Sequence, residues 1–131
     1  NGDLITAIDY GALVDSHLTS GAVASLGVVS HITELPYGVV RENDGDLVGI
    51  DEKPRREDLI SAGVAVLSRA AAEAVEDGVA CDMPQLLDRL VVDGLRVAVV
   101  RLDDYWLDVG TEKSLAIGHD DHTLTSEPTL D

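Results

Sequence analysis

Residues 37–54 read YGVVRENDGDLVGIDEKP, and this stretch decides the fold of the middle of the chain. Two runs of β-forming residues flank Asn43-Asp44-Gly45-Asp46, a cluster of turn-forming residues at the spacing of a β-hairpin. Pro54 stops the second run, because proline lacks the N–H group that a strand needs for its ladder of hydrogen bonds. The stretch therefore predicts a β-hairpin that presents Glu52 and Lys53, neighbours in sequence, at its rim.

Apolar runs and helix-capping residues alternate through the rest of the chain. An aspartate, serine or threonine precedes each predicted helix, where its side-chain oxygen can cap the first turn. We expect a loop over residues 31–36 and an irregular, charged connection over 55–58. The order of elements predicts an α/β fold, in which a mixed, mostly parallel sheet is flanked by helices. The predicted helices cover residues 10–20, 69–77, 83–93 and 112–118, and the predicted strands cover 22–30, 59–67, 96–102 and 105–109.

The composition is that of one globular domain. The chain has 131 residues, of which 45% are hydrophobic, enough for a buried core. Its formal net charge of −16 argues against nucleic-acid binding, because a phosphate backbone would be repelled. Its apolar runs are shorter than a membrane span, and its single cysteine, Cys81, favours a reducing cytoplasm. We therefore expect a cytoplasmic protein without nucleic-acid or membrane partners, in which a divalent cation screens any phosphate ligand.

The chain opens on Asn1-Gly2-Asp3, a tripeptide typical of a turn. Such a turn suits the loop at the carboxyl end of a strand, which is where open α/β sheets place their ligands. No strand precedes it in this sequence. We therefore expect that the first part of a larger domain precedes Asn1.

Asp3 and Asp108 are the two carboxylates best placed to hold a metal ion. Gly2 precedes Asp3 in the loop expected to follow a missing strand, and Gly110 comes two residues after Asp108, near the end of the predicted strand 105–109. Mg²⁺ is commonly held by one or two carboxylates, with substrate phosphates and water completing its octahedron. The alternative for each is an ordinary Asx-turn or helix cap, which turn aspartates commonly form.

Glu52 and Lys53 are candidates to bind sugar hydroxyls and a phosphate, respectively, because lysine offers a compact positive charge. The alternative is a solvated hairpin edge guarded by charged residues. Gly38 and Gly63 lie within predicted strands, where a missing side chain lets a ligand approach the backbone. For the glycines the alternative is a bulge or tight packing. His17 falls on the apolar side of its predicted helix and is expected to be a core histidine.

The order of six short motifs adds a resemblance to these separate candidates. NGDLIT, PYGVV, IDEKP, SAGVAVLS, DMP followed by LLDRL, and YWLDVGT occur in this order between residues 1 and 118. The series resembles the sugar-1-phosphate nucleotidyltransferase family, also called NDP-sugar pyrophosphorylases. It looks closest to mannose-1-phosphate guanylyltransferase-like members, and glucose-1-phosphate thymidylyltransferases come next.

The resemblance implies a magnesium-dependent transfer in which a nucleoside triphosphate and a sugar 1-phosphate give an NDP-sugar and pyrophosphate. It implies that Asp3 and Asp108 hold Mg²⁺. It also implies that Glu52 and Lys53 bind the sugar and its phosphate. The substrate-binding glycines Gly38 and Gly63 would lie against the sugar. The implied fold is the C-terminal portion of a Rossmann-like nucleotidyltransferase domain.

Two departures from the family pattern limit what the resemblance implies. The segment 61–65 reads SAGVA, without the asparagine and the aromatic residue of the family. The glycine-rich signature that carries the nucleotide site and the catalytic arginine does not occur in these residues. We therefore expect residues 1–118 to form the sugar-phosphate-binding portion of the domain, with no catalytic residue of its own and no activity alone. Residues 119–131 are expected to be a disordered or frayed polar tail.

A different class of function stays open beside the enzyme. The chain is alternatively a non-catalytic sugar-phosphate-binding module, or one used in regulation or assembly. A phosphatase is disfavoured, because no DxDxT-like nucleophile motif is present. In either remaining case we expect a homo-oligomer, because strand edges left bare by a missing half would pair with another copy.

Overall fold

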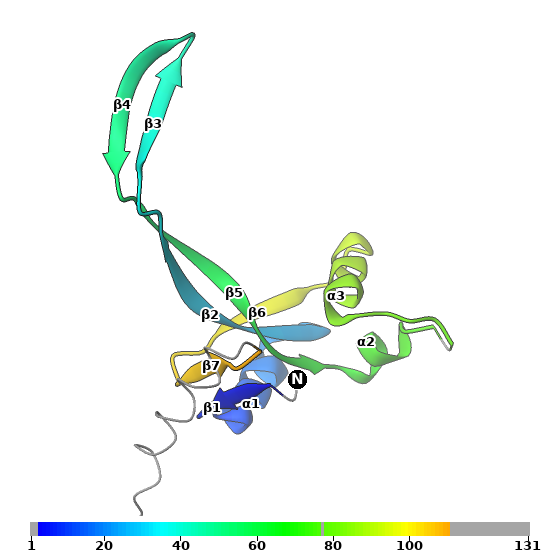
Figure 1. Cartoon of the computed structure of the whole chain (residues 1–131). Coiled ribbons are helices and arrows are strands. Elements are labelled where there is room, and N and C mark those ends of the chain that lie inside the picture. The colour runs from blue at the N-terminus through cyan, green and yellow to red at the C-terminus, as the bar shows by residue number, and fades with distance from the viewer. Residues whose placement is uncertain (1–2, 77, 111–131) are drawn as a thin grey trace, which may run out of the picture.

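The computed structural model describes residues 3–76 and 78–110 (Figure 1). Seven strands and three helices follow one another over this part of the chain. The predicted helix over 112–118 and the predicted tail lie outside the described residues. In chain order the elements are β1 (Leu4–Thr6), α1 (Tyr10–Ser20), β2 (Ala24–Glu34), β3 (Gly38–Asn43), β4 (Asp46–Glu52), β5 (Arg55–Leu67), α2 (Arg69–Glu73), α3 (Met83–Val92), β6 (Val97–Arg101) and β7 (Trp106–Asp108).

The strands form one three-stranded sheet and two strand pairs. The sheet has the order β5–β2–β6, β1 pairs with β7, and β3 pairs with β4. Among these pairings only β2 with β6 is parallel, so the prediction of a mostly parallel sheet is wrong. The reason is the predicted hairpin: it turns the chain back on itself, so β5 returns antiparallel to β2, whereas a parallel return needs a crossover. The α/β class and the mixed sheet are confirmed, and the Rossmann-like fold stays a prediction.

β2 and β5 are longer than the sequence predicted. They run out of the body together as a twisted ribbon, and the β3–β4 hairpin continues at its far end (Figure 1). Residues 31–34, expected in a loop, belong to β2, and residues 55–58, expected to be irregular, begin β5. Cross-strand pairing explains both extensions, since Arg55 lies opposite Glu34 and its Nε is 2.7 Å from Glu34 Oε2.

The predicted helix caps are confirmed where the structure describes them. Asp9 accepts a hydrogen bond from the Ala12 N–H, and Gly21 ends α1 in the left-handed conformation. At the start of α3, Asp82 is the N-cap as predicted, and it forms a reciprocal capping box with Gln85. No helix within the described ranges is long and apolar enough to cross a membrane.

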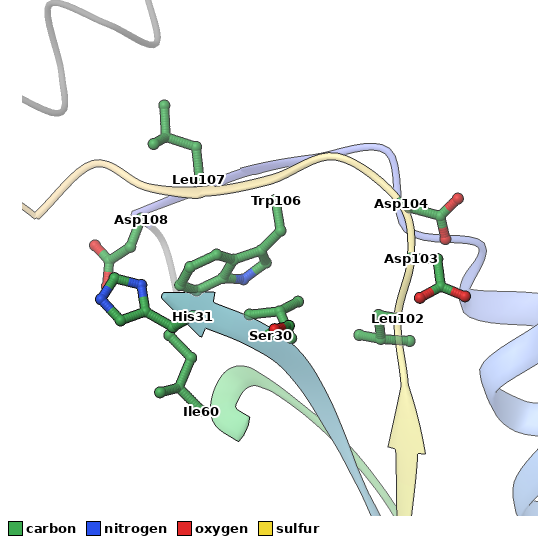
Figure 2. A pocket seen from close by; sticks show the side chains of 10 residues that line it. Ser30, His31, Ile60, Leu102, Asp103, Asp104, Trp106, Leu107 and Asp108 are labelled. Atoms are coloured by element: carbon green, nitrogen blue, oxygen red, sulfur yellow. The ribbon is translucent and has the colours of Figure 1, made fainter. Parts of the chain in front are cut away.

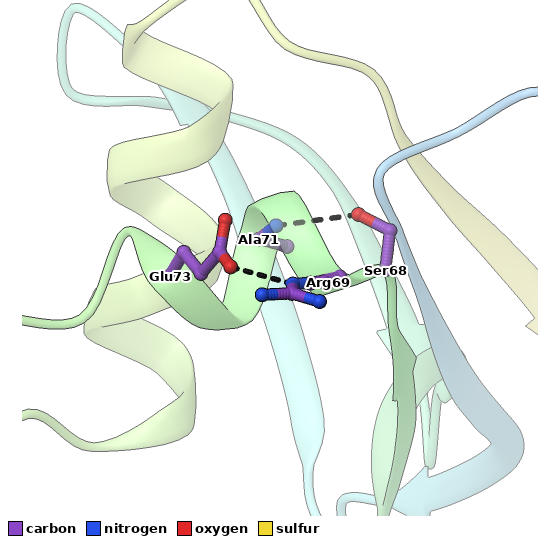
Figure 3. A network of polar contacts seen from close by, with 4 residues as sticks. All are labelled: Ser68, Arg69, Ala71 and Glu73. Carbon is purple, nitrogen blue, oxygen red and sulfur yellow. Dashed lines mark hydrogen bonds and ion pairs between the residues drawn. The ribbon is translucent and has the colours of Figure 1, made fainter.

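α2 is shorter than predicted, ending at Glu73 rather than at residue 77. Figure 3 shows its two local contacts: Ser68 Oγ accepts from the Ala71 N–H at 3.2 Å, and Arg69 Nε lies 2.6 Å from Glu73 Oε1. The ion pair is exposed, so it contributes little to stability. A single turn of helix therefore follows β5 and brings Ala71 into the core.

The core lies where α2 and α3 cover the inner end of β2. It is made of small and branched aliphatic side chains, as a chain without phenylalanine requires. His17 and Ser25 are also buried, and His17 Nδ1 lies 2.9 Å from Ser25 Oγ, which confirms His17 as a core histidine with a hydrogen-bond partner. The buried apolar cluster consists of Ala24, Ala71, Leu86, Leu87 and Leu90.

Candidate functional site

Asp3 and Asp108 lie side by side, although 104 residues separate them in sequence. β1 and β7 are antiparallel with Leu4 opposite Asp108, and the Val109 N–H donates to the Asp3 carbonyl oxygen at 2.9 Å. Both carboxylates face the space beside Gly110. A Cβ atom added at Gly110 would stand 2.9 Å from Asp108 Oδ1 and 3.8 Å from Asp3 Oδ2. The strand pairing thus creates a small space with two carboxylates around it, and the glycine keeps this space open.

Asp108 also forms the turn that was its alternative interpretation. Its Oδ1 accepts the Gly110 N–H at 2.8 Å. A carboxylate has about four acceptor positions, so this bond leaves capacity for a cation. Two carboxylates suit Mg²⁺ when phosphate and water oxygens complete its shell. Over the described ranges no group of three or more His, Cys, Asp or Glu side chains is arranged to hold a metal ion, so this pair has no third protein ligand there.

A pocket of about 670 Å³ opens beside Asp108, between β7, the end of β6 and β2 (Figure 2). Trp106 and Asp108 both line it, as expected for residues two apart on one strand. His31, from β2, lines it as well. No spacing in the sequence marks His31 or Trp106 as a site residue. The alternation of the WLD triplet could have placed Trp106 beside Asp108, but no local signal brings His31 there. The lining residues are Val29, Ser30, His31, Ile60, Leu102, Asp103, Asp104, Trp106, Leu107 and Asp108.

Gly38, Glu52 and Lys53 come together at the base of the β3–β4 hairpin. Gly38 lies directly opposite Glu52, and a Cβ atom added at Gly38 would stand 2.9 Å from Glu52 Oε2. The Lys53 N–H donates to the Tyr37 carbonyl oxygen at 3.2 Å, and Lys53 has a positive φ of 46°. Such a φ is uncommon for a residue with a side chain and marks the sharp change of direction between the hairpin and the β2–β5 ribbon.

Gly63 lies at a bulge of β5 with a positive φ of 73°. Val28 pairs with Ser61 and Leu26 with Ala65, so three residues of β5 stand opposite Gly27 alone. The bulge was the alternative interpretation of this glycine. Gly63 also lines a pocket of about 550 Å³ between β5 and the start of α3, which the small side chains of Ser61 and Ala65 widen. The full lining is Leu26, Ser61, Gly63, Val64, Ala65, Met83, Pro84, Leu87 and Asp88.

The six predicted site residues therefore occupy three places. Asp3 pairs with Asp108, Gly38 lies with Glu52 and Lys53, and Gly63 lies in a second pocket. The hairpin stands well away from β1 and β7 (Figure 1). From His31, which shares the pocket of Asp108, β2 runs outward for three more residues, roughly 10 Å of strand, before the hairpin base begins.

Two carboxylates close together can hold a cation when phosphate and water oxygens complete its shell. Residues 1–123 match the sequence profile of the family described as "Nucleotidyl transferase". The chain belongs to the nucleotidyl transferase family.

Several proteins similar in sequence to this chain have names that state a specific activity. The chain is 29% identical to the glucose-1-phosphate adenylyltransferase of Bacillus thuringiensis (strain Al Hakam), over 88% of the chain and 34% of that protein. It is 27% identical to a Sulfolobus acidocaldarius protein provisionally named as a mannose-1-phosphate guanyltransferase, over 86% of the chain and 31% of that protein. The chain thus spans about a third of the length of these curated relatives.

Solved structures show the same fold. A Bacillus anthracis protein provisionally named as a glucose-1-phosphate thymidylyltransferase, solved in complex with a sucrose, matches with a TM-score of 0.63 at 16% identity. The match covers 99% of this chain and 54% of that one. HddC from Yersinia pseudotuberculosis matches with a TM-score of 0.60 at 17% identity, over 93% of this chain and 53% of that one.

Proposed function

We propose that this chain supplies the sugar 1-phosphate side of a magnesium-dependent nucleotidyltransferase. The observation that carries the proposal is the meeting of Asp3 and Asp108 around the open space beside Gly110. The family and the names of the relatives support the reaction class, in which an NTP and a sugar 1-phosphate give an NDP-sugar and pyrophosphate. We also propose a cytoplasmic location, which the single cysteine favours.

In the proposed reaction a phosphate oxygen of the sugar 1-phosphate attacks the α-phosphorus of the NTP, and pyrophosphate leaves. Bound Mg²⁺ would neutralise charge on the phosphates. The chain's own contribution is to hold and orient the reactants, which is the main requirement of phosphoryl-type transfer. Asp3 and Asp108 hold the cation in this proposal. Glu52 binds sugar hydroxyls, Lys53 binds the sugar phosphate, and the backbone at Gly38 and Gly63 lies against the sugar.

Asp3 and Asp108, together called the acid pair, lie far from the hairpin base (Figure 1), and this distance bears on whether the chain acts alone. Glu52 and Lys53 lie on the projecting hairpin, outside the pocket that Asp108 lines. The glycine-rich stretch associated with the nucleotide is also absent from these 131 residues. We therefore propose that this polypeptide by itself does not catalyse the nucleotidyl transfer. Formation of an NDP-sugar by this exact chain from NTP, Mg²⁺ and glucose 1-phosphate or mannose 1-phosphate would contradict the proposed inactivity.

The second candidate is a non-catalytic module that binds a sugar phosphate for regulation or assembly. The same separation of the hairpin from the acid pair favours it. A binding module needs only one ligand site, whereas a transferase also needs a nucleotide site next to the sugar 1-phosphate site. Binding of a sugar 1-phosphate that does not depend on Mg²⁺, Asp3 or Asp108 would favour this candidate over the transferase.

Thermal unfolding with added ligands tests the transferase proposal, since a ligand that binds the folded state raises the melting temperature. Mg²⁺ and glucose 1-phosphate or mannose 1-phosphate are added alone and together. We expect Asp3→Asn and Asp108→Asn each to weaken Mg²⁺ binding about tenfold or more, equal to ~1.4 kcal/mol. Asparagine at 108 keeps an oxygen for the Gly110 N–H, so the turn is retained. Asp46→Asn, at the exposed start of β4, is the matched control and should bind Mg²⁺ as the wild type does.

A further inference from the structure

Trp106 joins two parts of the molecule that carry different site residues. It is the only tryptophan of the chain. Its indole Nε1 donates a hydrogen bond of 2.9 Å to the carbonyl oxygen of Ala62 on β5, and Ala62 is fully buried. Trp106 itself belongs to β7, which is paired with β1 rather than with the central sheet. The bond therefore ties the β1–β7 pair to the central sheet.

The acceptor of this bond lies at the bulge of β5. Ala62 immediately precedes Gly63, and both stand in the three-residue stretch opposite Gly27. A bulge interrupts the regular ladder and leaves backbone groups that need other partners. The indole N–H supplies such a partner to Ala62. The position of the bulge, including the left-handed Gly63, is thus linked to the position of the indole.

The donor side of the bond carries the acid pair. Trp106 and Asp108 are two residues apart on β7, so both side chains project from the same face of the strand. Both line the 670 Å³ pocket, and Figure 2 shows them within it. Gly63 lines the separate 550 Å³ pocket. The indole of Trp106 therefore links β7, the strand that carries Asp108, to the bulge of β5 that carries Gly63.

We propose that Trp106 is a positioning residue that fixes Asp108 relative to the Gly63 bulge and so couples cation binding to sugar 1-phosphate binding. The inference rests on the proposed function, because it takes the cation to bind at the Asp3–Asp108 pair and the sugar near Gly63. A movement of β7 on cation binding shifts the indole, and the indole shifts the Ala62 carbonyl and the bulge. Coupling of this kind is reciprocal: each ligand strengthens the binding of the other by the same factor.

The substitution that isolates the indole N–H is Trp106→Phe, which keeps an aromatic ring in the same place. In the wild type we expect Mg²⁺ to tighten glucose 1-phosphate binding, measured by calorimetry. In Trp106→Phe we expect this tightening to fall about fivefold, the equivalent of one neutral hydrogen bond, while each ligand alone binds nearly as before. Tyr10→Phe, which changes an exposed aromatic residue on α1, is the control and should keep the wild-type coupling.

A second measurement uses the wild-type protein and does not depend on the folding of any variant. A chain with one tryptophan gives one indole N–H resonance in a ¹⁵N-correlated NMR spectrum. A positioning role requires this resonance to shift on adding Mg²⁺ alone and to shift again on adding glucose 1-phosphate. Because Trp106 lines the pocket of Asp108, the shift with glucose 1-phosphate, whose proposed place near Gly63 is in the separate pocket, is the decisive one: an indole resonance that does not respond to it would overturn the positioning role.

The outcomes separate this inference from the function on which it rests. If the wild type binds neither Mg²⁺ nor glucose 1-phosphate, the proposed function fails and the coupling fails with it. If both bind and tighten each other but Trp106→Phe keeps the full coupling, the positioning role is overturned and the proposed function stands. If the variant loses affinity for both ligands equally, with no change in coupling, the role of Trp106 is structural and the inference is overturned.

Discussion

At the scale of single residues, two glycines of the β3–β4 hairpin differ in the side chain that lies over them. A Cβ atom at Gly38 would stand 2.9 Å from Glu52 Oε2, whereas one at Gly49 would stand 2.8 Å from Arg41 Nη2. A methyl group at Gly38 would therefore displace Glu52 and also Ile50, whose Cγ2 would lie 2.9 Å away, whereas a methyl group at Gly49 would displace Arg41. Only the first of these side chains belongs to the proposed sugar site.

We predict that Gly38→Ala weakens glucose 1-phosphate or mannose 1-phosphate binding about threefold to tenfold, because the new methyl group displaces the Glu52 carboxylate, together with Ile50, and occupies the space in which the backbone would meet the sugar. This loss corresponds to the ~1 kcal/mol of a typical hydrogen bond. Gly49→Ala displaces Arg41 instead and should leave the affinity unchanged. Calorimetric titration of both variants measures the difference. Equal affinities would remove Glu52 from the proposed site.

The acid pair shows what residue-level reasoning can and cannot reach. The turn chemistry of Asp108 is visible in its sequence, and its hydrogen bond to the Gly110 N–H follows from it. The nearness of Asp3 to Asp108 depends on the pairing of two three-residue strands at opposite ends of the described chain. Nothing local encodes that pairing, so only the order of the family's motifs pointed to it. The presence of His31 in the same pocket had no signal of either kind.

At the scale of elements, the helices were predictable because their ends are encoded locally. Asp82 caps α3 by accepting the Gln85 N–H at 2.8 Å, and Gln85 Oε1 accepts the Asp82 N–H at 3.3 Å. Strand ends are set differently, by partners far along the chain. This is why β2 and β5 extend beyond the predicted boundaries, and why the predicted direction of strand pairing was wrong for most of the pairs.

We predict that Asp82→Ala lowers the free energy of unfolding by about 1–2 kcal/mol, because α3 loses its N-terminal cap. The loss reaches the core, since Leu86, Leu87 and Leu90 of this helix are buried there. The matched control is Asp93→Ala at the other end of the helix. A negative charge near a helix C-terminus is unfavourable, so this change should be neutral or slightly stabilising. Urea denaturation compares the two, and equal losses would contradict the capping argument.

At the scale of the whole molecule, the hairpin arm is the part that the described chain leaves without a partner surface. Every residue of β3 is exposed, and all but one of β4. Val40 and Ile50 form a cross-strand pair, yet they are 59% and 56% exposed. Their sequence neighbours Arg41 and Asp51 point to the opposite face and form an ion pair at 3.1 Å. Val40 and Ile50 thus form an exposed apolar patch on one face of the hairpin, with Glu52 on the same face at the hairpin base. A lone two-stranded hairpin is only marginally stable in water.

We propose that a second copy of the chain covers this apolar patch, and we predict self-association that Val40→Thr with Ile50→Thr weakens at least tenfold. The reason is that each buried Val or Ile side chain contributes about 1.5–3 kcal/mol, and threonine keeps the β-branched shape while it lowers that contribution. Val92→Thr, on α3, is the matched control: Val92 is 84% exposed but lies off the hairpin, so the change should not alter the association.

Sedimentation equilibrium across the micromolar range measures the association of the wild type, the double variant and the control. A wild type that stays monomeric throughout, or a control that dissociates as readily as the double variant, would show that the hairpin face does not mediate self-association.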